Sequence, residues 1–206
     1  RVPRTTVTAQ DVLNRDELKK FLDAAQNNDL YPLILLLATT GLRIGEALAL
    51  EATDVSQKGL LTVTKTLQNY DRTDAIVKRF PKSESGIREI QLVPRLLEVL
   101  PRNQEGRLFP WTYARVTKAI KNVCHEAGVK VVKPHALRHT FCTTMLNEGV
   151  PVKTMTSIMG HKDAGFMLNT YAKFLESDLD RVPKAFERFF RHNSGTANGP
   201  KWKNLV

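Results

Sequence analysis

The sequence contains few cysteines and no long apolar run, and each shortage excludes a class of protein. Only two cysteines occur, Cys124 and Cys142, and they are not spaced as a C-x-x-C pair. We therefore expect neither a disulfide framework nor a zinc ribbon, and free thiols fit the reducing cytoplasm. The longest apolar run, Leu33 to Ala38, is much shorter than the roughly 20 residues that span a bilayer. No secretion signal precedes it, so the expectation is a soluble, cytoplasmic protein without a membrane partner.

Acidic residues are in the minority. The 206 residues include 31 Lys and Arg against 21 Asp and Glu, which leaves a formal net charge of +10. An excess of this size favours a polyanionic partner such as nucleic acid, although a solvated basic surface would give the same count. The length suits one large domain or two small ones with a full hydrophobic core.

The pattern of apolar residues predicts a mainly α fold with a small three-stranded antiparallel β-sheet, which is an α+β class. Asn14 and Glu17 form a capping-box pair, and the apolar residues that follow lie at helical spacing. Further helices are expected over residues 33–39, 41–50, 113–127, 134–148 and 152–159, with another beginning at Pro94. Segments 60–66, 75–80 and 87–92 are alternating or rich in β-branched residues, and they are predicted to be the strands.

An arginine lies at an apolar helix start in the motif T-G-L-R-I-G-E, residues 40–46. Burying a guanidinium is costly unless it meets an anion, so Arg43 is a candidate phosphate ligand. The same motif allows a simple ion pair between Arg43 and Glu46, which are three positions apart. The motif alone does not decide between the two.

A second motif, P-H-A-L-R-H at residues 134–139, places two cationic donors on one face of a helix. His135 and Arg138 are three positions apart and lie near the predicted helix N-terminus, which itself favours anions. Together they can grip a phosphoryl oxygen. A capped surface helix with an ordinary His and Arg fits the same six residues.

A third motif, M-G-H-K-D at residues 159–163, follows the predicted end of a helix. Tyr171 comes ten residues after His161, and alone it would be interpreted as a half-buried core residue. Taken in order and spacing, the three motifs and this tyrosine resemble one family, the tyrosine recombinases of the phage-integrase type. The resemblance covers residues 12–175.

The resemblance implies the catalytic-domain fold of that family and a site-specific enzyme that cleaves and rejoins DNA strands. The reaction runs through a 3′-phosphotyrosine intermediate, for a phage or another mobile element, and needs no metal and no cofactor. The catalytic residues implied by position are Arg43, Lys82, His135, Arg138, His161 and Tyr171, with Glu46 and His139 as supporting residues.

In that scheme Tyr171 is the nucleophile, cationic side chains stabilise the charge on the phosphate, and Lys82 protonates the leaving 5′-oxygen. Which of His135 and His161 handles the tyrosine proton stays open. Lys78 and Lys65 are alternatives for the lysine. One departure is that the family often has nine positions, not ten, between this histidine and the tyrosine.

The resemblance also implies how the chain is divided. Residues 1–13 are expected to link to an N-terminal core-binding domain, and residues 14–176 to form the catalytic domain. Residues 177–192 are expected to form a helix for exchange with a neighbouring subunit, and residues 193–206 a disordered tail. The implied partners are double-stranded DNA and further copies in a homo-tetramer on DNA, with accessory DNA-bending proteins as an option.

Two other functions fit parts of the sequence. His135, His139 and His161 are candidate zinc ligands of a hydrolase, but no H-E-x-x-H motif is present and Arg43 is left unexplained. A basic DNA-binding module without catalysis is the other alternative, and the complete set of motif residues argues against it.

Overall fold

The computed structural model describes residues 12–70, 75–80, 86–101, 105–160, 164–171 and 183. The chain divides into two units, residues 1–175 and 176–206, and every helix and strand given below lies in the first. The predicted C-terminal helix over residues 177–192 lies almost entirely outside the described residues. The mainly α class is confirmed, because most of the elements in the described part are helices.

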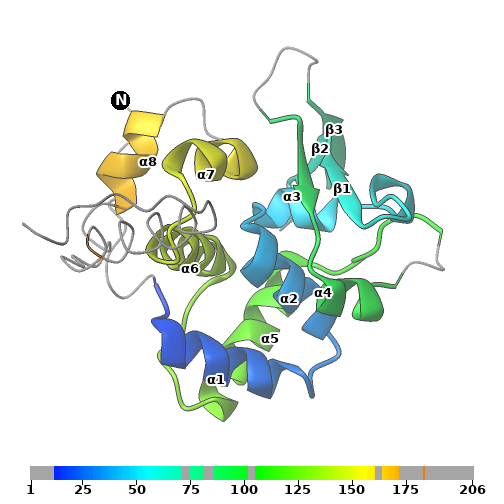
Figure 1. The fold of residues 1–206 in the computed structure, drawn as a ribbon. Helices are drawn as coiled ribbons and strands as arrows, with labels where there is room; N and C mark the ends of the chain where they lie inside the picture. Colours follow the sequence, from blue (N-terminus) through cyan, green and yellow to red (C-terminus); the bar gives the residue numbers. More distant parts are fainter. Residues whose placement is uncertain are drawn as a thin grey trace, which may run out of the picture. The chain divides into compact units, whose positions relative to one another are not determined.

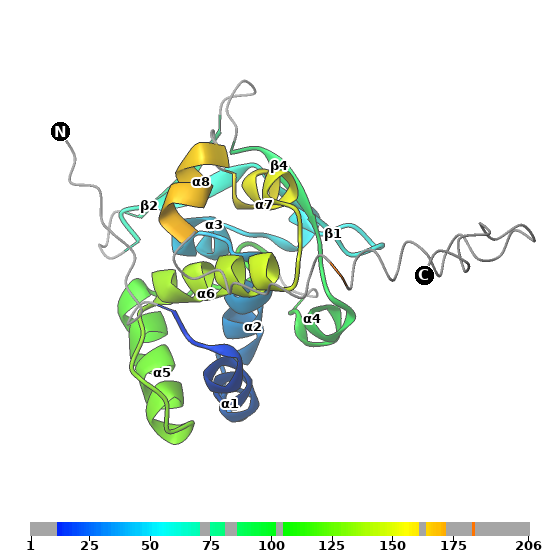
Figure 2. The same cartoon turned by 60° about the vertical axis from the view of Figure 1, so that its left-hand side comes forward.

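The four longer helices all contribute to the larger hydrophobic core: α1 (Arg15–Ala25), α2 (Tyr31–Thr40), α5 (Tyr113–Glu126) and α6 (Pro134–Asn147). Helix α2 passes between the others, as Figures 1 and 2 show, and eight of its ten residues are buried. The capping box predicted for α1 is present: Asn14 accepts from the Glu17 amide at 2.9 Å, and Glu17 accepts from the Asn14 amide at 2.8 Å.

Four shorter α-helices are α3 (Ile44–Leu48), α4 (Pro94–Val99), α7 (Val152–Met159) and α8 (Ala164–Tyr171), and a 3-10 helix covers Ala52–Asp54. Gly41 ends α2 and Gly160 ends α7, each in the left-handed conformation with φ of 64° and 62°. Glycine adopts this conformation at low cost. Helix α2 therefore ends within the motif of residues 40–46, and α7 ends within the motif of residues 159–163. Helix α8, which carries Tyr171 at its last position, was not predicted.

The β-structure differs in detail from the predicted three-stranded sheet. Four strands form two antiparallel pairs: β1 (Leu60–Val63) with β4 (Arg88–Gln91), and β2 (Lys65–Gln68) with β3 (Ile76–Arg79). The predicted strand over 60–66 is divided at Thr64, where the chain changes partner. The Thr64 carbonyl accepts a hydrogen bond from the Phe80 amide at 2.8 Å, which extends the pairing of β2 with β3 by one residue.

A second, smaller hydrophobic cluster lies around α6, α7 and α8. It contains Phe141, Cys142, Leu146, Met155, Met159, Met167 and Tyr171. Both cysteines are buried free thiols. Among the described residues, no helix has the length and apolar character to cross a membrane.

Candidate active site

Arg43 stands at the start of α3, at the position before its first helical residue. Its Nη1 donates to Oε1 of Glu46 at 2.8 Å, and its backbone amide donates to Oε2 of the same carboxylate at 2.8 Å. The ion pair suggested by the sequence is therefore present. However, the Arg43 side chain is 44% exposed while Glu46 is 1% exposed, so the guanidinium also faces solvent. Ion pairing and access to an anion are both features of this arginine.

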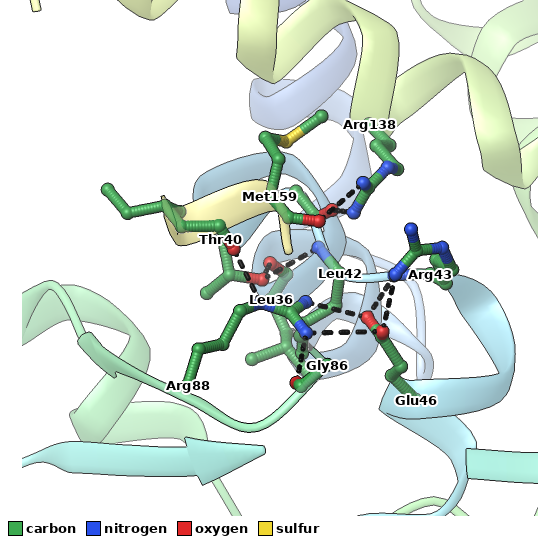
Figure 3. Close-up of polar contacts among 11 residues, drawn as sticks. Leu36, Thr40, Leu42, Arg43, Glu46, Gly86, Arg88, Arg138 and Met159 are labelled. Atoms are coloured by element: carbon green, nitrogen blue, oxygen red, sulfur yellow. Dashed lines mark hydrogen bonds and ion pairs between the residues drawn. The ribbon is translucent and has the colours of Figure 1, made fainter. Parts of the chain in front are cut away.

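Glu46 has a second cationic partner that the sequence reasoning missed. Arg88 on β4 donates to both oxygens of the Glu46 carboxylate, from Nη2 at 2.7 Å and from Nη1 at 3.2 Å (Figure 3). Burial alone would raise the pKa of Glu46, but the hydrogen bond and charge of Arg88 and the charge of Arg43 outweigh it and hold that pKa below its ordinary value. The carboxylate is thus ionised between two guanidinium groups.

Arg138 lies on α6 and is almost fully buried. Its guanidinium donates to the Gly41 carbonyl at the end of α2 and, at 2.7 Å, to the Met159 carbonyl at the end of α7 (Figure 3). Burial first, and then the charge of Arg43, lowers its pKa to about 10, so the group is still a cation at neutral pH. Three arginines and one carboxylate in this cluster leave a net charge of +2.

Tyr171 reaches the site from the end of α8. Its hydroxyl lies 2.8 Å from Nδ1 of His139, and the His139 ring meets His135 edge-on with 4.5 Å between ring centroids. His135 lies at the exposed start of α6. The predicted nucleophile therefore contacts an imidazole, and that imidazole is His139. The sequence had indicated His139 only as a supporting residue.

The tyrosine is 1% exposed and lies in the smaller hydrophobic cluster. Burial raises the pKa of Tyr171 above its ordinary value, and the adjacent Cys142 adds to the rise, whereas the charges of Arg138 and Arg43 oppose it. Burial also raises the pKa of the Cys142 thiol to about 12. The phenol is therefore protonated in this structure, within the field of the two arginines that the sequence motifs singled out.

The lysine candidates fall in different environments. Lys65 is buried in an ion-pair network, with Nζ 2.7 Å from Glu51 and 2.9 Å from Asp54, which favours a structural role. Lys78 is exposed on β3. Lys82 and His161 lie outside the described residues, so both stay predictions.

Within the described segments, no group of three or more His, Cys, Asp and Glu side chains is placed to hold a metal ion. The zinc alternative required His135, His139 and His161. The first two lie together, as given above, but the third is outside those segments.

A sequence signal for Arg88 was available in the strand itself. Residues on β4 alternate between buried and exposed, with Arg88 and Ile90 on the buried face and Glu89 and Gln91 on the exposed face. An arginine on the apolar face of a strand indicates a buried anionic partner, because an unpaired buried charge is costly. The alternation does not indicate which carboxylate that partner is.

Comparison with known proteins agrees with the resemblance. Residues 11–177 match the model of the phage integrase family. A XerC-like tyrosine recombinase of Caldanaerobacter subterraneus is 28% identical over 216 residues, and tyrosine recombinase XerA of Pyrococcus furiosus is 30% identical over 198 residues. These alignments cover 89% and 91% of this chain but only 55% and 65% of the two relatives. The chain therefore spans less than two thirds of their length.

Solved structures share the fold. The Tn1549 transposon integrase, in complex with transposon right-end DNA, matches with a TM-score of 0.71 and 23% identity over 89% of this chain and 67% of that one. The catalytic domain of bacteriophage HP1 integrase matches with a TM-score of 0.61 and 24% identity over 84% of this chain and 93% of that one. With the tyrosine recombinase fold and the match over residues 11–177, the chain belongs to the phage integrase family.

Proposed function

We propose that this chain is the catalytic part of a site-specific DNA recombinase, a metal-independent strand transferase that acts through a 3′-phosphotyrosine. The observation that carries the proposal is the setting of Tyr171. Its hydroxyl lies 2.8 Å from Nδ1 of His139 on α6, and Arg138 is the residue before that histidine on the same helix. A nucleophile, a proton acceptor and cations near the same hydroxyl are the groups that phosphoryl transfer to a side chain requires.

In the proposed step the Tyr171 oxygen attacks the phosphorus of a DNA phosphodiester, and the bond from phosphorus to the 5′-oxygen breaks. The phenol proton passes to an imidazole, for which His139 is in contact in the structure. The leaving 5′-oxygen takes a proton from a lysine, for which Lys82 is our choice. Attack by the 5′-hydroxyl of another strand reverses the step, so the bond energy is conserved and the strands are rejoined.

The charge of the arginine cluster suits the transition state of this step. Arg43, Arg88, Arg138 and Glu46 sum to a charge of +2, because three guanidinium groups share one carboxylate. A pentavalent phosphate carries more negative charge on its equatorial oxygens than the diester does. Fixed cations near those oxygens therefore stabilise the transition state more than the substrate. We assign direct contact with the phosphate to Arg43, His135 and His161, and also to Arg138, which is 2% exposed and must be uncovered for that contact.

DNA is the partner on which the proposal depends. The net charge of +10 and the DNA complexes solved for related integrases support it. We also propose that copies of the protein assemble as a tetramer on DNA and that residues 177–192 pass to a neighbouring subunit, with accessory DNA-bending proteins as an option. Acting on the DNA of the cell agrees with the cytoplasmic location suggested by two free thiols.

The proposal is tested by covalent capture. The chain is mixed with nicked duplex DNA of randomised sequence in EDTA, and protein–DNA adducts that survive denaturation are isolated and sequenced. Wild type should form an adduct, and Tyr171→Phe should form none while binding DNA as before. Tyr31→Phe is the matched control, because that buried hydroxyl has no hydrogen-bond partner in the described structure. Binding without an adduct would favour the non-catalytic module, and hydrolysis only on addition of Zn²⁺ would favour the zinc enzyme.

A further inference from the structure

Arg88 is a buried arginine that none of the sequence motifs includes. It lies on β4, opposite Val63 of β1 in the antiparallel register, and its side chain is 4% exposed. Every nitrogen of its guanidinium is bonded to a protein group. Its role must therefore be sought in the protein groups that it contacts.

Those contacts connect three separate segments of the chain (Figure 3). The fork of Nη1 and Nη2 holds both oxygens of Glu46 on α3, at 3.2 Å and 2.7 Å. Nη1 also donates to the Gly86 carbonyl at 3.0 Å, beside the strand's own start. Nε donates to the Ile158 carbonyl in the last turn of α7. Every nitrogen of the guanidinium is thus engaged.

On the α3 side, Arg88 fixes the orientation of Arg43 through Glu46. The carboxylate that Arg88 holds accepts both the backbone amide and the Nη1 of Arg43, each at 2.8 Å. Because Glu46 is 1% exposed, solvent has little access to replace Arg88 as its partner. Without Arg88, the Glu46 carboxylate would have Arg43 as its one cationic partner in the cluster. It would then turn toward the Arg43 guanidinium or pull that guanidinium away from solvent.

On the α7 side, Arg88 helps to end the helix at the turn that leads to His161. The last carbonyls of a helix have no partner within it, and those of Ile158 and Met159 are taken by Arg88 and Arg138. The two arginines therefore hold adjacent carbonyls of the same turn. Gly160 follows, and a Cβ atom there would lie 3.1 Å from Nη1 of Arg88. The chain beside His161 is thus packed directly against the Arg88 guanidinium.

We propose that Arg88 is a positioning residue, which holds Arg43 through Glu46 and the end of α7 through the Ile158 carbonyl, so that both sides of the phosphate site keep one geometry. This inference rests on the proposed DNA-cleaving function. Arg88 itself does not touch the DNA. Its loss should therefore reduce the rate of strand cleavage while leaving the affinity for DNA nearly unchanged.

The test compares Arg88→Met and Arg88→Lys with Lys65→Met. Lys65 was an alternative for the catalytic lysine, but its Nζ is held by Glu51 and Asp54 in a separate ion-pair network, so it is the matched control: a buried cation on a strand, outside the arginine cluster. Single-turnover cleavage of a captured DNA sequence should fall about 10²-fold in Arg88→Met, the scale expected when a catalytic group is misplaced by about 1 Å. Arg88→Lys keeps the positive charge but not the paired Nη1 and Nη2 donors, so its cleavage rate should lie between those of Arg88→Met and wild type. This variant also tests the inference if Arg88→Met does not fold. Dissociation constants should change by less than about twofold, since the exposed surface is unchanged.

A double-mutant cycle separates positioning from a general loss of stability. If Arg88 acts through Arg43, the combined loss in Arg43→Ala plus Arg88→Met should fall short of the product of the single losses by about tenfold or more. Lys65→Met should combine with Arg43→Ala as a simple product. Two results would overturn the positioning role in a wild-type chain that forms its adduct. One is a double mutant whose loss of cleavage rate equals the product of the two single losses, and the other is an Arg88→Met rate within about threefold of wild type.

Amide hydrogen exchange gives a measurement that does not depend on cleavage. In Arg88→Met, the amides of Arg43 and Gly160 should exchange faster, because one is bonded to Glu46 and the other closes the last turn of α7. In Lys65→Met both should exchange as in wild type. Unchanged exchange in Arg88→Met would overturn the inference. A wild-type chain that forms no adduct would contradict the proposed function instead, and the exchange rates would still decide whether Arg88 holds the cluster.

Discussion

Replacing Glu46 by glutamine tests whether one buried carboxylate organises the arginine cluster. Oε1 accepts from Nη1 of Arg43 at 2.8 Å and Nη1 of Arg88 at 3.2 Å, and Oε2 accepts from the Arg43 amide at 2.8 Å and Nη2 of Arg88 at 2.7 Å. A glutamine keeps the shape but puts an NH₂ group in place of one oxygen. Whichever way the amide is turned, two of the four contacts become a donor facing a donor.

The cost follows from the number of contacts that are lost. Removing one partner of a buried ion pair costs about 3–5 kcal/mol, and the lower end applies here because glutamine keeps two hydrogen bonds. We expect Glu46→Gln to lower the free energy of unfolding by about 3 kcal/mol at pH 7. With a urea m-value of about 2 kcal/mol/M, the midpoint of unfolding should fall by about 1.5 M, which circular dichroism measures directly.

The effect should also depend on pH. The pKa of Glu46 in the folded state is below the ordinary value of 4.5, so this carboxylate stabilises the fold above pH 4.5 and loses that contribution as the pH falls through its folded pKa. The difference between wild type and Glu46→Gln should therefore be full at pH 7 and should narrow below pH 4.5. Glu89→Gln, on the exposed face of β4, is the control and should match wild type at both pH values. A difference under about 1 kcal/mol at pH 7, or one that does not narrow in acid, would refute the reasoning.

Measurements on DNA and on a shortened chain extend the same reasoning. Arg43→Ala and Arg138→Ala should each lower the cleavage rate by at least about 10²-fold, as when one preorganised donor is removed, and near-wild-type cleavage by either would contradict the phosphate site. DNA binding by the chain should weaken steeply with salt, because phosphate contacts release counterions, and a flat salt titration would argue against it. Truncation after Glu176 should leave the melting temperature nearly unchanged but abolish coordinated strand exchange. A sharply lowered melting temperature with unchanged assembly on DNA would instead show that residues 177–192 pack on their own chain.

The helices were predictable because their signals are local. Asn14 and Glu17 satisfy each other across one turn, and Gly160 supplies the left-handed residue that ends α7, so both boundaries are written in a few adjacent residues. The pairing of the strands is not local. Whether the segment after Leu60 keeps one partner or changes partner at Thr64 depends on residues that lie 8 to 31 positions away, from Gln68↔Ile76 to Leu60↔Gln91. The alternation along each strand is the same in both arrangements.

The site was predictable where a motif fixed the residue and not where a contact joined distant side chains. The motifs predicted Arg43, Arg138 and Tyr171 as site residues, and the structure brings the two arginines to one cluster, while the catalytic roles stay predictions. The contact of His139 with Tyr171 was missed, since the two residues are 32 positions apart and meet only through the packing of α6 and α8. Arg88 was missed for the same reason: its partner Glu46 is 42 positions away.

The buried position of Tyr171 limits how the proposed reaction can begin. The hydroxyl must contact phosphorus, yet the residue is 1% exposed and is packed among Phe141, Met155 and Met167, where a DNA backbone cannot enter. Attack therefore requires Tyr171 to depart from the apolar side chains of this cluster while it keeps its contact with His139, and α8, which ends at Tyr171, is the element on which such a movement depends. Methionine side chains adapt to changes of shape at low cost, which makes such a departure easier than from a cluster of branched residues. Arg43, in contrast, already faces solvent, so a phosphate can bind before the nucleophile arrives. Removing the hydroxyl of Tyr171 should abolish the adduct, because the nucleophile is lost. It should leave DNA binding intact, because the buried tyrosine is not part of the exposed surface.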